Sequence, residues 1–182
     1  SPQVIGKKHP FPFLNNQEIY AVALLESKNN DKICIVPCRS SVFNRLVQIV
    51  PGSGRYMLIE ELILHYMPMI FENYTVKSKS LIRITRNADI DIDEIFADED
   101  ISYRESMEEL IRMRKKLCPI RMEYSRVLDE KVIKSLCKEL GLNKKQTFYS
   151  KAPLDLSFVF KIQDILRNNR ELFFKRRVPQ IS

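Results

Sequence analysis

Two arginines three positions apart, Arg83 and Arg86, are suited by type and spacing to bind an anionic group. They end a segment, 75–86, in which one face of a strand has the cations Lys77, Lys79 and Arg83 together with Leu81 and Thr85, and the other face has Val76, Ile82 and Ile84. Cations two residues apart on one sheet surface stand about 7 Å from each other, and such groups donate charge-assisted hydrogen bonds to phosphate oxygens. The segment therefore predicts a solvent-facing basic surface that could hold phosphate groups, with the apolar face buried.

A structural role competes with phosphate binding at this surface. Residues 120–123 have the pattern of a second strand, and if that strand pairs with the first, Glu123 could come opposite Arg83. The two side chains would then form a cross-strand ion pair that serves only the fold. We favour this structural interpretation for Arg83 and Arg86 over phosphate binding. Arg121, on the second strand, is a third basic candidate with the same two possible roles.

Residues that could act as nucleophiles or metal ligands are few. The only histidines are His9 and His65, and His65 lies within an apolar helical pattern, where a packed or hydrogen-bonded imidazole is the common outcome. Four cysteines lie in or beside apolar segments without paired short spacings, which indicates buried, reduced thiols: Cys34, Cys38, Cys118 and Cys137. A zinc site or a cysteine nucleophile would need histidines nearby. We therefore expect no catalytic residue and no metal site in this chain.

The composition excludes several other classes of site. Four glycines in 182 residues are too few for a glycine-rich phosphate loop, and residues 51–54 have the chemistry of a hairpin turn. No stretch approaches the roughly 18 uncharged apolar residues of a membrane span, because Glu60, Glu61 and His65 interrupt the most apolar segment. The first residues, 1–3, show neither an initiator Met nor a targeting pattern, which suggests a segment of a longer chain.

The charge is distributed unevenly along the sequence. Thirty Lys and Arg against 23 Asp and Glu give a net charge of +7, but residues 87–109 contain ten acids and one base, which leaves +16 on the remainder. The basic side of such a molecule could steer a polyanion, and the acidic side could meet a basic surface. Two solvated faces without a partner are the simpler interpretation, which composition alone favours.

The residues that could do chemistry lie on a succession of predicted strands and helices. Period-two patterns predict strands at about 17–26, 33–36, 43–50, 55–59, 75–86, 119–124 and near 148. Helical patterns cover about 58–71, 98–117, 129–140 and 156–166. Asp129 is the expected cap of the third helix, and Gly141 its end. The order predicts a single α+β domain in which a mixed β-sheet packs with about four helices.

Four short motifs follow one another along the chain. They are His9-Pro10-Phe11-Pro12-Phe13, Arg83-Ile84-Thr85-Arg86-Asn87-Ala88-Asp89, Ile120-Arg121-Met122-Glu123 and Pro153-Leu154-Asp155-Leu156-Ser157. In this order and spacing the sequence resembles the middle, or head, domain of polyphosphate kinase over nearly its whole length. The resemblance implies structural roles for the motif residues His9, Pro10, Phe11, Pro12, Asp89, Glu123 and Asp155. Departures, such as Leu81 and Ile82 where that family usually has an aromatic residue, indicate a divergent member.

The resemblance also implies a function for the intact protein. Polyphosphate kinases reversibly transfer the terminal phosphate of ATP to inorganic polyphosphate, through a phosphohistidine and with magnesium. The family's phosphorylated histidine and phosphate-binding arginines lie in two later domains that resemble phospholipase D, and neither His9 nor His65 corresponds to a catalytic histidine. The chain alone is then expected to be inactive and to hold no cofactor, while ATP, magnesium and polyphosphate belong to the intact enzyme.

The same resemblance predicts how this chain would serve such an enzyme. Residues 1–182 would form the middle domain, which supports dimerisation and scaffolding and contacts the other domains of its polypeptide. By composition, the basic tail 167–182 could bind nucleic acid or a membrane surface. The resemblance instead implies that the tail connects this domain to the phospholipase D-like part. We expect a cytoplasmic protein without a nucleic-acid partner; a peripheral location at the membrane is the alternative. The alternatives are a free-standing polyanion-binding module and a small phosphotransferase that uses His9 or His65.

Overall fold

A six-stranded sheet is the centre of the molecule. The computed structural model describes residues 2–6, 9–27, 30–38, 44–87 and 118–174. The strands, in their order across the sheet, are β1 (Gln3–Val4), β3 (Lys32–Pro37), β2 (Ile19–Glu26), β6 (Thr75–Arg86), β7 (Pro119–Tyr124) and β8 (Thr147–Tyr149). All neighbours are antiparallel except β7 and β8, which are parallel, so the sheet is mixed as predicted.

The two central strands, β2 and β6, are covered on both faces of the sheet. Every residue of β2 except Glu26 is buried, and Ala21 pairs with Leu81 of β6. The expectation of a solvent-facing surface on β6 is wrong at its middle, because Leu81 belongs to the core beneath a helix. Alternation along a strand places residues on two faces, but it does not say what covers each face.

Three α-helices lie within the described residues, against the four predicted. They are α1 (Ile59–Ile70), α4 (Glu130–Leu140) and α5 (Phe158–Ile165), with short 3-10 turns at η1 (Lys144–Gln146) and η2 (Arg170–Leu172). The remaining predicted helix, 98–117, falls outside the described residues. The predicted ends of α4 are confirmed: the Asp129 carboxylate accepts a hydrogen bond from the Lys131 amide, and Gly141 adopts the left-handed conformation at φ 67°.

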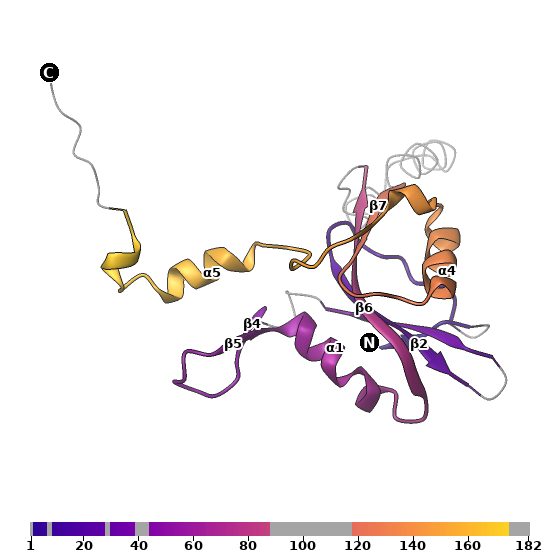
Figure 1. Ribbon diagram of the computed structural model, residues 1–182, viewed down its shortest axis with the longest axis horizontal. Helices are drawn as coiled ribbons and strands as arrows, with labels where there is room; N and C mark the ends of the chain where they lie inside the picture. The colour runs from indigo at the N-terminus through magenta and orange to yellow at the C-terminus, as the bar shows by residue number, and fades with distance from the viewer. Residues whose placement is uncertain (1, 7–8, 28–29, 39–43, 88–117, 175–182) are drawn as a thin grey trace, which may run out of the picture.

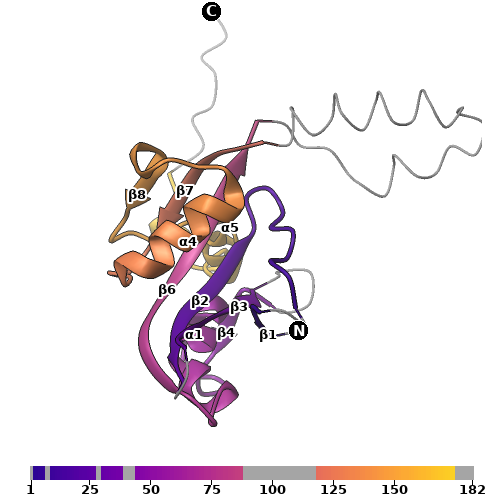
Figure 2. The ribbon, with the colours of Figure 1, turned by 90° about the vertical axis from the view of Figure 1, so that its right-hand side faces the viewer.

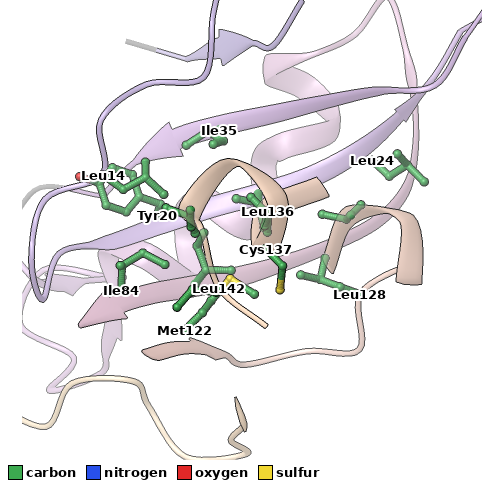
Figure 3. Close-up of a cluster of buried hydrophobic side chains, with 14 residues drawn as sticks. Leu14, Tyr20, Leu24, Ile35, Ile84, Met122, Leu128, Leu136, Cys137 and Leu142 are labelled. Atoms are coloured by element: carbon green, nitrogen blue, oxygen red, sulfur yellow. The ribbon is translucent and has the colours of Figure 1, made fainter. Parts of the chain in front are cut away.

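Two apolar cores fill the space on either side of the sheet. On one side α4 packs its buried face, including Val132 and Leu136, against Tyr20, Ile84 and Met122 of the sheet (Figure 3). On the other side Leu64 and Met67 of α1 pack against small residues of β2 and against β3. Figure 1 shows this helix–sheet–helix arrangement, with α1 and α4 on opposite sides of β6. The predicted α+β single-domain fold is therefore confirmed.

A hairpin and a helix extend away from this layered body. The hairpin joins β4 (Leu46–Gln48) to β5 (Tyr56–Leu58), and its turn uses positive φ angles at Gly52 and Gly54. Helix α5, which follows β8, has no buried residue. Both elements extend to the same side of the sheet in Figure 1. None of the helices in the described part of the chain is long and apolar enough to cross a membrane.

Candidate functional site

Arg45, at the base of the β4–β5 hairpin, is the centre of a buried ionic cluster. Only 9% of the residue is exposed. Its Nε and Nη2 atoms donate to Oε1 of Glu60, at 3.0 and 2.7 Å. Its Nη1 atom donates to the Asp155 carboxylate and, at 2.9 Å, to Oγ of Ser157. One guanidinium therefore joins the first turn of α1 to the segment that leads into α5.

The Arg45 cluster contains two carboxylates in unlike surroundings. The Glu60 side chain is 3% exposed, whereas that of Asp155 is 29% exposed. Partial burial alone would raise the pKa of Asp155, but hydrogen bonds from the amide and hydroxyl of Ser157, together with the charges of Arg45 and Arg83, lower it overall. Asp155 is therefore held as a carboxylate that accepts from Ser157 and Arg45.

Arg83 lies beside this cluster and donates mainly to backbone carbonyls. Its Nη1 atom donates to the Leu154 carbonyl at 3.0 Å, and its Nε atom to the Gln17 carbonyl at 3.2 Å. Gln17 has a positive φ of 58°, which turns the chain into β2. Glu123 is the register partner of Arg83 across β6 and β7, as expected. Its carboxylate instead pairs with Arg121 of its own strand, 2.8 Å away.

Arg86 is buried at the end of β6 against the N-terminal segment. Its Nε atom donates to the Leu14 carbonyl at 2.8 Å, and its guanidinium lies 4.1 Å from the centre of the Phe13 ring. Burial lowers the pKa of Arg86, although a guanidinium stays charged at neutral pH. Arg86 therefore ties two of the sequence motifs together, the one that contains Phe13 and the one that ends β6.

The other motif residues have contacts outside the Arg45 cluster, or none that decides their role. His9 and Pro10 are exposed, while Phe11 and Pro12 are half-buried and Phe11 packs against the α4-side core. Arg121 is about half exposed, and its guanidinium stacks 4.6 Å from the centre of the Phe148 ring. Asp89 falls outside the described residues.

A groove of about 410 Å³ runs beside the cluster, between the start of α1 and the segment after β8. Arg126, on its wall, pairs with Glu61 at 2.6 Å. Buried Ser80 accepts hydrogen bonds from the Ser125 and Arg126 amides, at 3.1 and 2.9 Å, and so positions this wall. Lys151 is the other cation that lines the groove.

Groups that could perform covalent chemistry are poorly placed within the described residues. Burial raises the pKa of the Cys34 and Cys38 thiols to about 12, which disfavours the reactive thiolates. Cys118, expected to be buried, is exposed. His65, expected to be packed or hydrogen-bonded, is exposed on α1 beside the Tyr66 ring. Within this part of the chain no three His, Cys, Asp or Glu residues group as a metal site would need.

The family of the chain follows from comparison with known sequences. A family model of the polyphosphate kinase middle domain matches residues 1–162. The chain belongs to this family. The match covers the residues of the Arg45 cluster and all four sequence motifs.

Curated relatives of this middle domain are much longer proteins. The polyphosphate kinase of Halalkalibacterium halodurans is 32% identical over 173 residues, which are 91% of this chain and 24% of the relative. That of Bacillus cereus is 30% identical over 191 residues, which are 99% of this chain and 26% of the relative. The chain therefore spans about a quarter of the length of these relatives.

A solved structure supports the fold independently. Polyphosphate kinase from Porphyromonas gingivalis superposes with a TM-score of 0.58 and 15% sequence identity over 82% of this chain and 20% of that one. At this identity the likeness concerns the fold alone. This chain shares that fold, and within it arginines join distant segments.

Sequence reasoning located part of this arrangement. It singled out Arg83, Arg86 and Asp155, and the structure brings Arg83 and Asp155 to one place. It missed Arg45 and Glu60, which are the most buried charges of the cluster. In the sequence, Arg45 is a single cation within the apolar pattern 43–50, and Glu60 is an acid at the start of an apolar helical pattern. Neither pattern indicates which residue would be the partner.

Proposed function

We propose that this chain is the non-catalytic middle domain of an enzyme that transfers the terminal phosphate of ATP to inorganic polyphosphate. The family match carries the identity of the enzyme class. The phosphohistidine, the magnesium and the ATP site would be supplied by other parts of the polypeptide. Within this chain the work is structural: the domain scaffolds the enzyme and supports its dimerisation.

The commitment of the arginines to internal acceptors supports the scaffolding role. Arg45 is occupied by two carboxylates and a hydroxyl, Arg83 by two backbone carbonyls, and Arg86 by a carbonyl and an aromatic ring. A guanidinium that binds phosphate must present several free donors to it. Arg45 and Arg86 instead satisfy a carboxylate and a carbonyl that burial would otherwise leave unpaired, and Arg83 bridges two backbone carbonyls of distant segments.

Exposed apolar residues support a role in assembly. Tyr66, Met69 and Ile70 lie on the outer side of α1, away from the core that Leu64 and Met67 fill. Contiguous apolar side chains on a surface mark contacts with other proteins or domains. We place the subunit contact of the dimer on this side of α1.

The test compares the intact enzyme with the chain alone. Both are incubated with ATP and magnesium, and polyphosphate synthesis is measured with a dye that reports chain length. We expect synthesis by the full-length protein and none by residues 1–182. Synthesis by the isolated chain contradicts the proposal, and so does a full-length protein that fails to use ATP while it remains folded.

A further inference from the structure

Helix α4 has a row of lysines on the side that faces away from the sheet. Lys131, Lys134 and Lys138 follow one another at spacings of three and four residues, which places them along one face of the helix. Val132 and Leu136 are buried on the opposite face, against the sheet. Figure 2 turns α4 toward the viewer, and no other described helix or strand crosses over it there. The row of lysines is therefore open to a partner in the described part of the molecule.

A fourth lysine joins this row from the η1 turn. The Nζ atoms of Lys134 and Lys144 lie 3.5 and 3.4 Å from Oε1 of Glu130, so the two lysines share one carboxylate. The hydrogen bond from Lys144 and the charge of Lys134 lower the pKa of Glu130, so negative charge is favoured at this place. We call Lys131, Lys134, Lys138 and Lys144 the lysine face. All four side chains are exposed.

The lysine face has more cations than neighbouring carboxylates. Asp31 lies 3.9 Å from Lys131 and 3.4 Å from Lys77, so it too is shared between two lysines. Lys138 forms no ion pair with any residue that the structure describes. Glu139, the next residue, is turned about 100° away from it around the helix. Exposed ion pairs are weak, so these carboxylates can release their lysines to a ligand that carries more negative charge.

We propose that the lysine face binds a chain of inorganic polyphosphate. This inference rests on the proposed function, and it names the part of the middle domain that would contact the polymer. Lys131 and Lys138 are about 10 Å apart along the helix axis, so a single phosphate ion cannot reach both. A chain of phosphates can contact all the lysines at once, and several weak contacts with one ligand reinforce one another.

Lysine suits this ligand because its ammonium group is a compact charge with three donors and no fixed plane. A polyphosphate chain is flexible and presents phosphate oxygens along its whole length, so it requires positive charge rather than a particular donor geometry. Arg45 and Arg83 differ from the lysines, since their donors are occupied by internal acceptors. The two types of cation therefore have separate roles: the arginines hold the fold, and the lysines face the polymer.

Nucleic acid and an anionic membrane are the competing ligands. Proteins bind single-stranded nucleic acid through aromatic side chains that stack on the bases as well as through cations, and α4 contains no aromatic residue. A helix that lies on a membrane inserts an apolar face, whereas the apolar face of α4 is buried within this domain. Polyphosphate requires neither feature, so it fits the lysine face best.

The test measures how fast each lysine of the full-length enzyme reacts with an acetylating reagent, with and without long-chain polyphosphate. Mass spectrometry of the digested protein gives a separate rate for each lysine. At a polyphosphate concentration about ten times the dissociation constant, the lysines of the face should react about tenfold more slowly. Lys161, an exposed lysine of α5 that lies away from α4 in Figure 1, is the matched control, and its rate should not change.

Other anions are compared at the same concentration of phosphate groups. Orthophosphate should give no protection, because it cannot span the lysine face. Single-stranded DNA and vesicles of anionic phospholipid should each give less protection than polyphosphate. Unchanged rates with polyphosphate, or equal protection by any of the other anions, overturn the proposal.

Removal of charge from α4 provides a second and independent measurement. The changes Lys131→Gln, Lys134→Gln and Lys138→Gln are combined in the full-length enzyme, and the matched control has arginine at the same three positions. Loss of three cations should reduce the slope of the logarithm of polyphosphate affinity against that of salt concentration by about two. The arginine variant should keep the slope of the wild type. A glutamine variant with the wild-type slope contradicts the proposal, and so does an arginine variant that loses as much as the glutamine variant.

Polyphosphate synthesis from ATP by the unmodified full-length enzyme is measured in parallel. An enzyme that synthesises polyphosphate while the lysine face stays unprotected refutes this inference alone. An enzyme that fails to synthesise polyphosphate refutes the proposed function.

Discussion

Replacing Arg45 with methionine should destabilise this domain more than any other single loss of charge among its described residues. Methionine keeps most of the side-chain volume, so the change removes the charge and its hydrogen bonds with little change in packing. The Glu60 carboxylate, 3% exposed, is then left without its cation, and the more exposed Asp155 can still be solvated. The cost thus arises mainly at Glu60.

The magnitude follows from that unpaired carboxylate. Removal of one partner from a buried pair costs about 3–5 kcal/mol, which is a large share of the roughly 5–15 kcal/mol that stabilises a typical domain. For a chain of this size the melting temperature should fall by on the order of 10 °C. Glu60→Gln removes the uncompensated charge, so the Arg45→Met, Glu60→Gln double variant should recover most of the loss.

The assay is chemical and thermal unfolding of the purified chain, followed by circular dichroism, for the wild type, both single variants and the double variant. The free energies of unfolding give the coupling between Arg45 and Glu60 directly. Additive losses in the double variant, or a single Arg45→Met variant that melts within about 1 °C of the wild type, would refute the reasoning.

Three further predictions concern Asp155, the two arginines of β6 and the end of α4. The lowered pKa of Asp155 stabilises the fold at pH values above the ordinary pKa of 3.8, and this stabilisation is lost as the pH falls through the lower pKa of the folded state. The difference in unfolding free energy between wild type and Asp155→Asn should therefore shrink below about pH 4. A difference that is constant at all pH values speaks against this. Arg86→Ala removes the donor to the buried Leu14 carbonyl, and Arg83→Ala removes the donor to the part-buried Leu154 carbonyl. Each should cost about 1–3 kcal/mol and lower the melting temperature more than the affinity for polyphosphate. Loss of affinity at an unchanged melting temperature reverses that order. Gly141→Ala should lower the free energy of unfolding by about 1 kcal/mol through its left-handed backbone alone, because no atom lies within 4 Å of an added methyl group. Gly6→Ala is the matched control. Equal melting curves for the two variants would show that backbone strain is absent.

The local features of the fold could be predicted from the sequence because they depend on neighbouring residues. The cap at Asp129 and the end of α4 at Gly141 are set within one helical turn, and the register of Arg83 with Glu123 follows from two alternating strands. The cover over β6 could not be predicted in this way. Leu81 is buried because α1 packs over it, and that contact depends on the tertiary fold.

The arginine contacts escaped prediction for a related reason. Arg45 finds Glu60 fifteen positions away and Asp155 one hundred and ten positions away, and no spacing rule connects residues so distant. Arg83 donates to the carbonyls of Gln17 and Leu154, which any residue type could supply. A search for charged partners therefore indicated Glu123, whereas the fold supplied backbone acceptors.

The most direct test of the central claim is the location of the phosphorylated residue in the intact enzyme. The full-length protein is incubated with labelled ATP and magnesium, digested, and its acid-labile phosphopeptides are identified by mass spectrometry. Our account predicts label on a histidine outside residues 1–182 and none on His9 or His65. Acid-labile phosphate on either of these two histidines, formed as fast as the enzyme turns over, would contradict it.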